Sequence, residues 1–220
     1  AFIFGGVWAF IPAILKNRWG ISETVNTIMF NYIATMFVGI AIRGVLMDSA
    51  DYLPQSAKTD CNLPLLLLPT RFHLGFFIAV VIALLIWFVM YKTVLGYELK
   101  VSGSNPRGAL CVGIPVQKSL LTAAILSGGL SGIAGSVELL GVQHRLMENL
   151  SAGNGFTAIL IALLAKNHPL GVILVSILYA ALQVGANTMQ RQMGIPSSIV
   201  SILIGFIVFL ILSKDFWELH

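Results

Sequence analysis

The chain has 220 residues, of which 57% are hydrophobic and only 10% are charged, and its mean hydropathy is +0.90. A soluble domain carries about a quarter charged residues, so this composition excludes an ordinary soluble protein and predicts one that spans a lipid bilayer. The formal net charge of +4 comes from cations scattered along the chain rather than clustered, which argues against nucleic acid as a partner.

The first apolar segment, Ala1–Leu15, has no basic flank before it and therefore lacks the pattern of a signal peptide. We expect it to be the tail of a membrane segment, kinked or ended near Pro12, in a chain that is truncated at its N-terminus. A second membrane segment is predicted over Val25–Ile42. The polar segment 48–73 follows with three prolines and is predicted to be an extracytoplasmic loop, whose run Leu63–Pro69 is expected to lie in the membrane interface.

Four further spans and one short apolar segment are predicted downstream. The longest uncharged stretch, Leu74–Tyr91, would be roughly 27 Å long as a helix, close to the thickness of a bilayer core. The short segment, Phe156–Ala165, would reach only about 15 Å, so it is expected to be shortened or buried among neighbouring helices. The predicted spans are Leu74–Tyr91, Ser119–Leu140, Leu170–Met189 and Ser197–Ser213. The sequence thus predicts an all-α, polytopic transmembrane helical bundle, a single domain over 1–220 with about six membrane segments, one of them short.

The positions of the cations predict the orientation in the membrane. Alternating the spans places eight Lys and Arg residues on one side and five on the other, and the eight lie in short loops, where the positive-inside rule applies best. The side with eight is therefore predicted to be cytoplasmic, and it includes the polar segment 92–118. Cys61 and Cys111 fall on opposite sides, so they are not expected to pair.

The segment 92–118 is predicted to be a cytoplasmic loop that docks a partner. Its centre carries turn residues, and we expect Asn105-Pro106 to set a turn and Ala109–Ile114 to form a short helix. The alternative is a solvated connector between two spans. The residues predicted to make the contact are Gly103, Asn105, Pro106, Ala109, Gly113 and Ile114.

The span Ser119–Leu140 has a face of small residues. Ala124, Gly128 and Gly132 recur every four residues, a pattern that lets another helix backbone approach closely. We therefore predict that this face packs against a second helix.

A polar stripe lies beside that face. Ser127, Ser131 and Glu138 align within about 20° at 100° per residue, and a carboxylate in a span is usually turned toward a cavity or paired. The stripe is predicted to line a polar pathway, with Glu138 as a cap at the outer mouth of the span as the alternative. Asn31 and Asn187 lie in other spans and could hydrogen-bond a neutral solute or another helix.

No motif for catalysis or cofactor binding is present in the sequence. There is no Gly-x4-Gly-Lys-Ser/Thr phosphate-binding loop, HExxH, CxxC or nucleophile elbow, and the histidines have no partner at metal-ligand spacing. The chain is therefore not expected to be an enzyme, to hold a metal or cofactor, or to bind ATP by itself.

Several stretches together resemble the permeases of ATP-binding-cassette (ABC) importers of the branched-chain amino acid, ribose and nucleoside group. The resemblance covers essentially the whole chain, and its most specific parts are the loop and the glycine-rich helix that follows. The stretches are 8–16, 27–32, 96–100, 103–106, 113–114, 127–135, 138–143, 155–156 and 167–171. The chain departs at Arg107-Gly108, where the family tends to carry an acidic or small polar residue and then alanine. Glycine there would weaken a short helix by about 1 kcal/mol.

The resemblance implies a helical permease with inverted repeats in a bacterial cytoplasmic membrane. It further implies a second permease subunit, cytoplasmic ATPase subunits that hold ATP and Mg²⁺, and an extracytoplasmic solute-binding protein. Stretches 138–143 and 185–190 are most similar to nucleoside (simple-sugar-like) permeases, so the expected solute is a nucleoside. The alternatives are an importer for ribose or other simple sugars, and an ion-coupled secondary carrier, although carriers usually place several carboxylates or broken helices at mid-membrane.

Overall fold

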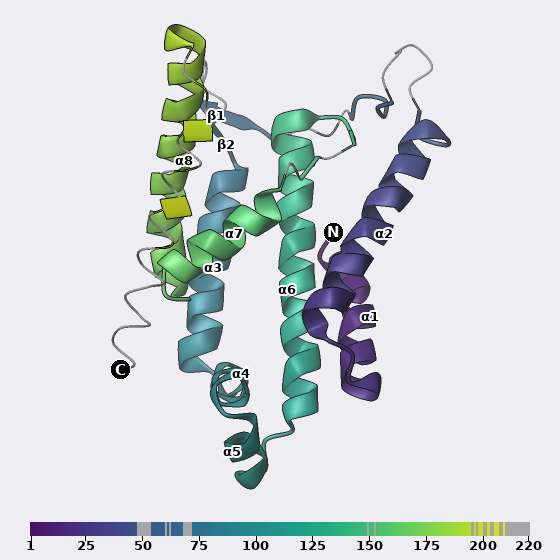
Figure 1. Ribbon diagram of the computed structural model, residues 1–220, viewed down its shortest axis with the longest axis vertical. Coiled ribbons are helices and arrows are strands. Elements are labelled where there is room, and N and C mark those ends of the chain that lie inside the picture. Colours follow the sequence, from purple (N-terminus) through teal and green to yellow (C-terminus); the bar gives the residue numbers. More distant parts are fainter. Residues whose placement is uncertain are drawn as a thin grey trace. The chain divides into compact units, whose positions relative to one another are not determined.

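The computed structural model of the chain is mainly helical (Figure 1). It describes residues 1–47, 54–59, 61, 63–67, 72–148, 150–151, 153–194, 196, 198–199, 202, 205–206 and 209. The helices are α1 Phe2–Trp19, α2 Glu23–Arg43, α3 Gly75–Lys92, α4 Val94–Ser104, α5 Pro106–Cys111, α6 Val116–Glu138, the π-helix η1 Leu139–Gln143, α7 Asn154–Leu164 and α8 Pro169–Met193. A short antiparallel hairpin joins β1 Leu65–Leu67 to β2 Phe72–His73. The predicted all-α class is confirmed.

Contacts divide the chain into two compact units, Ala1–Ala152 and Gly153–His220, which are described separately. Among the described residues, four helices are long and apolar enough to cross a membrane: Glu23–Arg43, Gly75–Lys92, Val116–Gln143 and Pro169–Met193. Each of them contains a predicted span or, for α3, all of it but the first residue, which confirms a multi-pass membrane protein.

In the first unit, α1 and α2 form an antiparallel pair across a tight turn. Gly20 adopts a left-handed conformation (φ 64°) that ends α1, and its N–H donates to the carbonyl of Lys16. Lys16 also pairs with Glu23 in the first turn of α2. A positive φ at a helix end favours glycine, so the Trp19–Gly20 sequence is what stops α1 here.

Helix α1 runs through Pro12 to Trp19, so it does not end at the proline, one of the two outcomes expected there. The buried Asn26 side chain of α2 donates from Nδ2 to the Pro12 carbonyl at 2.8 Å. This hydrogen bond ties α2 to α1 at the proline itself, whereas the carbonyl that loses its helical N–H partner to a proline at this position is that of Trp8, four residues earlier. Trp8 adds edge contacts to Phe30 and Phe37, with ring centroids 5.9 and 6.2 Å apart.

Helices α1 and α6 pack backbone to backbone. Gly5 lies against Gly128 and Gly132, so a Cβ added at Gly5 would come within 3.1 Å of the Gly132 Cα. A Cβ added at Gly128 would lie 2.5 Å from the Gly5 carbonyl oxygen, closer than real Cβ atoms approach. Gly129 faces the ring of Phe2 in the same interface. The small-residue face of α6 is thus occupied by α1.

At its C-terminal end, α6 continues as η1, and the residues there form hydrogen bonds with the extended segment that precedes β1. The i→i+5 bond from the His144 N–H to the Leu139 carbonyl marks the π-turn. The Leu140 carbonyl accepts a hydrogen bond from the Leu63 N–H, and Ser56 and Leu146 are joined by two more. Arg43 at the end of α2 pairs with Glu148 at 2.7 Å. The described residues of segment 48–73 are therefore held along the end of α6. The run Leu63–Pro69, predicted to lie in the membrane interface, contributes β1, and residues 68 and 69 lie outside the described residues.

In the second unit, a four-residue break, Ala165–His168, separates the short helix α7 from the long helix α8. Lys166 and Asn167 both have positive φ values (51° and 55°). Helix α8 then begins at Pro169, which occupies its first turn. Helix α7 has 11 residues, in agreement with the predicted short segment. Most of the predicted span Ser197–Ser213 lies outside the described residues.

Candidate functional site

The segment 92–118 forms two helices rather than an open loop. Helix α4 follows α3 after Thr93, whose hydroxyl accepts from the Gly96 N–H, and Figure 1 shows it nearly end-on at the lower end of α3. Helix α4 was not predicted from the sequence. Its closest approach is at Gly96, where an added Cβ would meet the α3 backbone at Met90.

The predicted short helix exists, but its bounds are wrong. It spans Pro106–Cys111 instead of Ala109–Ile114, because the Asn105 side chain caps it by accepting from the Gly108 N–H at 2.9 Å. Proline is well suited to the first helical position, where its missing N–H would have no partner. The helix ends before Gly113, which has φ 83°. Asn105-Pro106 is thus a helix start and not a separate turn.

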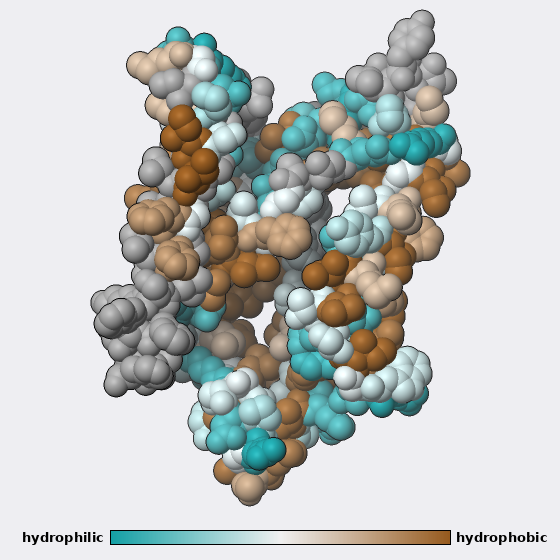
Figure 2. All heavy atoms as spheres, in the orientation of Figure 1, coloured by the Kyte–Doolittle hydropathy of each residue, from teal (hydrophilic) through white to brown (hydrophobic). Residues whose placement is uncertain are grey.

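Helix α5 is fixed on one side and exposed on the other. Ala109 and Ile114 are buried, and the Ile114 N–H donates to the Ala109 carbonyl at 2.9 Å. Leu110 and Val112 are 63% and 72% exposed. Figure 2 shows hydrophilic residues gathered around α4 and α5 at this end of the first unit, with hydrophobic surface at the tip of α5. Gly103 is also exposed, and a Cβ there would meet nothing within 4 Å.

The polar stripe of α6 lies off the face that contacts α1. At about 100° per residue around the helix axis, the direction of the stripe differs by about 130° from the mean direction of the α6 residues that contact α1. Ser127 and Ser131 are exposed, and the Ser131 hydroxyl donates to the Gly128 carbonyl at 2.8 Å, which leaves its lone pairs free. Glu138 is half-buried and is the last residue of α6 before η1. A Cβ at Gly135, beside the stripe, would meet nothing within 4 Å.

The other predicted pathway residues are not gathered at this stripe. Asn31 is exposed on α2, which packs on α1. Asn187 is exposed on α8, in the second unit. Ala124 lies on α6 one turn before Gly128 and is half-buried. The structure therefore brings together Ser127, Ser131 and Glu138 on one helix.

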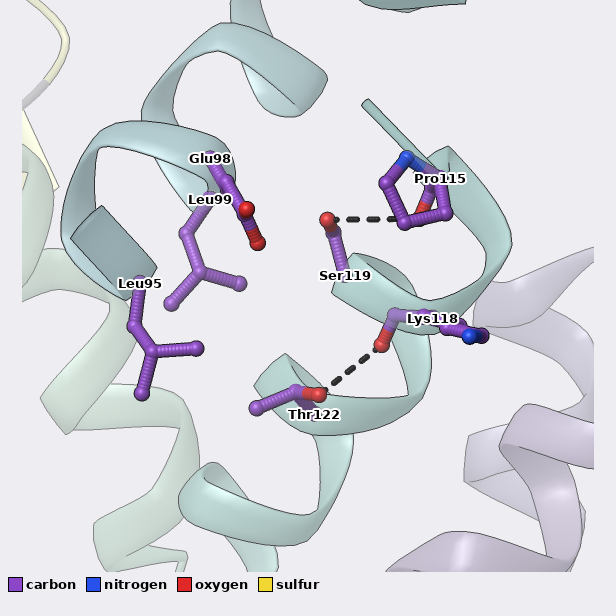
Figure 3. A pocket seen from close by; sticks show the side chains of 7 residues that line it. All are labelled: Leu95, Glu98, Leu99, Pro115, Lys118, Ser119 and Thr122. Atoms are coloured by element: carbon purple, nitrogen blue, oxygen red, sulfur yellow. Dashed lines mark hydrogen bonds between the residues drawn. The ribbon is translucent and has the colours of Figure 1, made fainter. Parts of the chain in front are cut away.

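A pocket of about 200 Å³ opens between α4 and the start of α6 (Figure 3). Its lining residues are Leu95, Glu98, Leu99, Pro115, Lys118, Ser119 and Thr122. The sequence analysis did not single it out, because α4 was not predicted. The described residues contain no group of three or more His, Cys, Asp and Glu side chains that could hold a metal ion. The described cysteines, Cys61 and Cys111, are both free and exposed.

Comparison with known proteins gives consistent matches over nearly the whole chain. The family model described as "Branched-chain amino acid transport system / permease component" matches residues 1–212. A guanosine ABC transporter permease protein of Bacillus subtilis is 36% identical over 96% of this chain and 62% of its own length. A nucleoside ABC transporter permease protein of Lactococcus lactis is 31% identical over 96% of this chain and 61% of its own length.

A glucose ABC transporter permease protein of Haloferax volcanii is also similar, being 30% identical over 99% of this chain and 60% of its own length. The chain thus spans about three fifths of the length of these relatives. No solved structure matches significantly.

Proposed function

The chain belongs to the branched-chain amino acid transport system / permease component family, and on that premise we propose that it is the membrane-spanning permease subunit of an ABC importer. The observation that carries the proposal is α5, a capped helix displayed beyond the ends of α3 and α6. A permease without a phosphate-binding loop does not bind ATP itself. It therefore needs a surface that contacts a separate ATPase and transmits the conformational change of that ATPase to the spans. An exposed short helix on a firmly anchored base is suited to that contact.

In this proposal α5 docks a cytoplasmic ATPase subunit, which binds ATP and Mg²⁺ and carries out hydrolysis. The buried Ala109 and Ile114 hold the helix, and Asn105 with Pro106 fixes its start. The exposed Leu110 and Val112 make the contact. A second permease subunit and an extracytoplasmic solute-binding protein complete the transporter.

We further propose that the solute is a nucleoside. Two relatives are named as guanosine and nucleoside permeases, and both match 96% of the chain. A neutral molecule rich in hydroxyls needs donors and acceptors but no fixed counter-charge, and the stripe of Ser127, Ser131 and Glu138 supplies them. Asn31 and Asn187 are the further polar residues proposed for the pathway. A simple sugar is the second candidate, because one relative is named as a glucose permease.

Replacing Glu138 by alanine tests the pathway. The carboxylate is proposed to accept hydrogen bonds from ribose hydroxyls, and loss of one such bond, worth about 1 kcal/mol, is expected to slow nucleoside uptake roughly fivefold. Ser127→Ala and Ser131→Ala are expected to slow it less. Initial uptake rates are compared at equal amounts of protein in the membrane.

Glu148→Ala is the matched control, since it removes another carboxylate at the same end of the spans. Its partner Arg43 is exposed, and an exposed pair contributes little to stability, so uptake is expected to stay near wild type. Equal rates for Glu138→Ala and wild type would contradict the pathway.

A further inference from the structure

The pocket between α4 and α6 has apolar walls and a carboxylate inside it. Leu95, Leu99 and Pro115 line one part, and Figure 3 shows the Glu98 carboxylate directed into the space toward Ser119. Glu98 is half-buried, and it makes no hydrogen bond or ion pair with any residue that the structure describes. A partly buried carboxylate beside apolar side chains, with no partner among the described residues, can accept from a donor outside the chain.

The two hydroxyls of the pocket offer acceptors rather than donors. The Ser119 hydroxyl donates to the Pro115 carbonyl at 3.4 Å, and the Thr122 hydroxyl donates to the Lys118 carbonyl at 2.9 Å (Figure 3). A hydroxyl has one donor and two lone pairs, so both oxygens can still accept. A carboxylate and two acceptor oxygens together are complementary to a cation that carries several N–H groups.

The pocket lies at the level where a membrane span ends. Ser119 and Thr122 are in the first two turns of α6, which is long and apolar enough to cross a bilayer. Helix α4 lies at the end of α3 and exposes Val94 and Tyr97, while the Lys100 ammonium sits 3.3 Å from the centre of the Tyr91 ring. Apolar and aromatic residues next to lysines are typical of the headgroup region.

We propose that this pocket binds the phosphoethanolamine headgroup of a membrane phospholipid. The primary ammonium donates to the Glu98 carboxylate and to the hydroxyl oxygens of Ser119 and Thr122. Lys118 stands at the rim with its ammonium directed outward (Figure 3), where it faces the phosphate. A pocket of about 200 Å³ leaves the acyl chains in the bilayer. A choline headgroup has no N–H to donate and fits poorly.

The occupant is a lipid rather than a basic side chain of the ATPase. Figure 1 shows that α5, the proposed docking element, lies farther from α3 than α4 does. A subunit bound at α5 is therefore proposed to leave the pocket open to the membrane. The site also places a cation, Lys118, on the rim, which suits a ligand that has an anionic group next to its ammonium. A lone lysine or arginine side chain has no such group.

The test is lipid retention by the purified, complete transporter complex. The complex is equilibrated in nanodiscs with equal amounts of phosphatidylethanolamine and phosphatidylcholine of identical acyl chains, and the retained lipids are counted by native mass spectrometry. Wild type is expected to prefer the ethanolamine lipid, and Glu98→Gln to lower that preference on the order of tenfold, because hydrogen bonds to a charged group are strong. Glu23→Gln, which removes an exposed carboxylate at the cytoplasmic end of α2, is expected to leave the preference unchanged.

Three results would overturn the proposal. The first is equal retention of the two lipids by wild type. The second is an unchanged lipid preference in Glu98→Gln. The third is an unchanged preference together with loss of the ATPase from Glu98→Gln, which would assign the pocket to a basic side chain of that subunit. If Glu98→Gln does not fold, Thr122→Val removes an acceptor oxygen at nearly constant volume and is expected to lower the preference severalfold. Because no transport is measured, failure here would leave the importer proposal untouched.

Discussion

Gly128→Leu is expected to abolish the packing of α1 on α6 and to leave little folded protein. Even a single added carbon at Gly128 would lie 2.5 Å from the Gly5 carbonyl oxygen and would overlap Ala9. The atoms in the way belong mostly to the backbone of α1, which cannot rotate aside as a side chain can. Overpacking costs up to about 3 kcal/mol even where side chains can rearrange, so a loss of at least that size is expected here.

The control is Gly135→Leu, seven residues later on the same helix. A Cβ at Gly135 meets nothing within 4 Å, and the same residue type is introduced. The amount of monodisperse protein left after heating, measured by size-exclusion chromatography, is expected to fall for Gly128→Leu and to stay near wild type for Gly135→Leu. Equal thermal stability of the two variants would mean that α1 does not occupy this face of α6.

Leu110→Asp is expected to detach the ATPase while the permease stays folded. Leu110 is 63% exposed on α5, so the aspartate can be hydrated in the free permease and should not disturb its folding. In a complex it would bury an unpaired charge in an apolar contact, a change that typically costs several kcal/mol. Co-purification of the ATPase is expected to fall at least about tenfold, since each 1.4 kcal/mol changes affinity tenfold, and uptake is expected to fall with it.

Val45→Asp serves as the matched control, because Val45 is 97% exposed and lies two residues beyond the C-terminal end of α2. It adds the same charge to an exposed apolar position, but on the side that is predicted to be extracytoplasmic. ATPase co-purification should therefore be unchanged. A Leu110→Asp permease that retains its ATPase and its transport would remove α5 from the proposed contact.

The spans are predictable because each is a long apolar run with polar flanks. The predicted segment Leu74–Tyr91 corresponds to α3 at Gly75–Lys92, and Ser119–Leu140 lies within the 28 residues of α6 and η1. Hydropathy over that length reflects the thickness of a bilayer, so tertiary packing changes the outcome little. The end of α1 was less predictable, because proline ends some helices and is tolerated inside others, and the local sequence does not decide between these outcomes.

Shorter elements and packing partners depend on information that hydropathy does not contain. Helix α4 was missed because its 11 residues mix apolar and polar types and include two glycines. The start of α5 was recoverable: asparagine followed by proline is a helix N-terminal signature, and the pair had been interpreted as a turn. The glycine pattern of α6 identifies a face but not its partner, and Gly5 was not recognised as its counterpart.

The central claim, an ATP-driven nucleoside permease, is tested most directly by uptake into proteoliposomes. The complete transporter, with its ATPase and solute-binding protein, is reconstituted without ion gradients and supplied with ATP or ADP on the cytoplasmic side. We expect radiolabelled guanosine to accumulate with ATP only, with competition by unlabelled uridine and none by ribose or leucine. Uptake of ribose or leucine but of no nucleoside would contradict the assigned solute, and guanosine uptake that requires an ion gradient instead of ATP would contradict the importer itself.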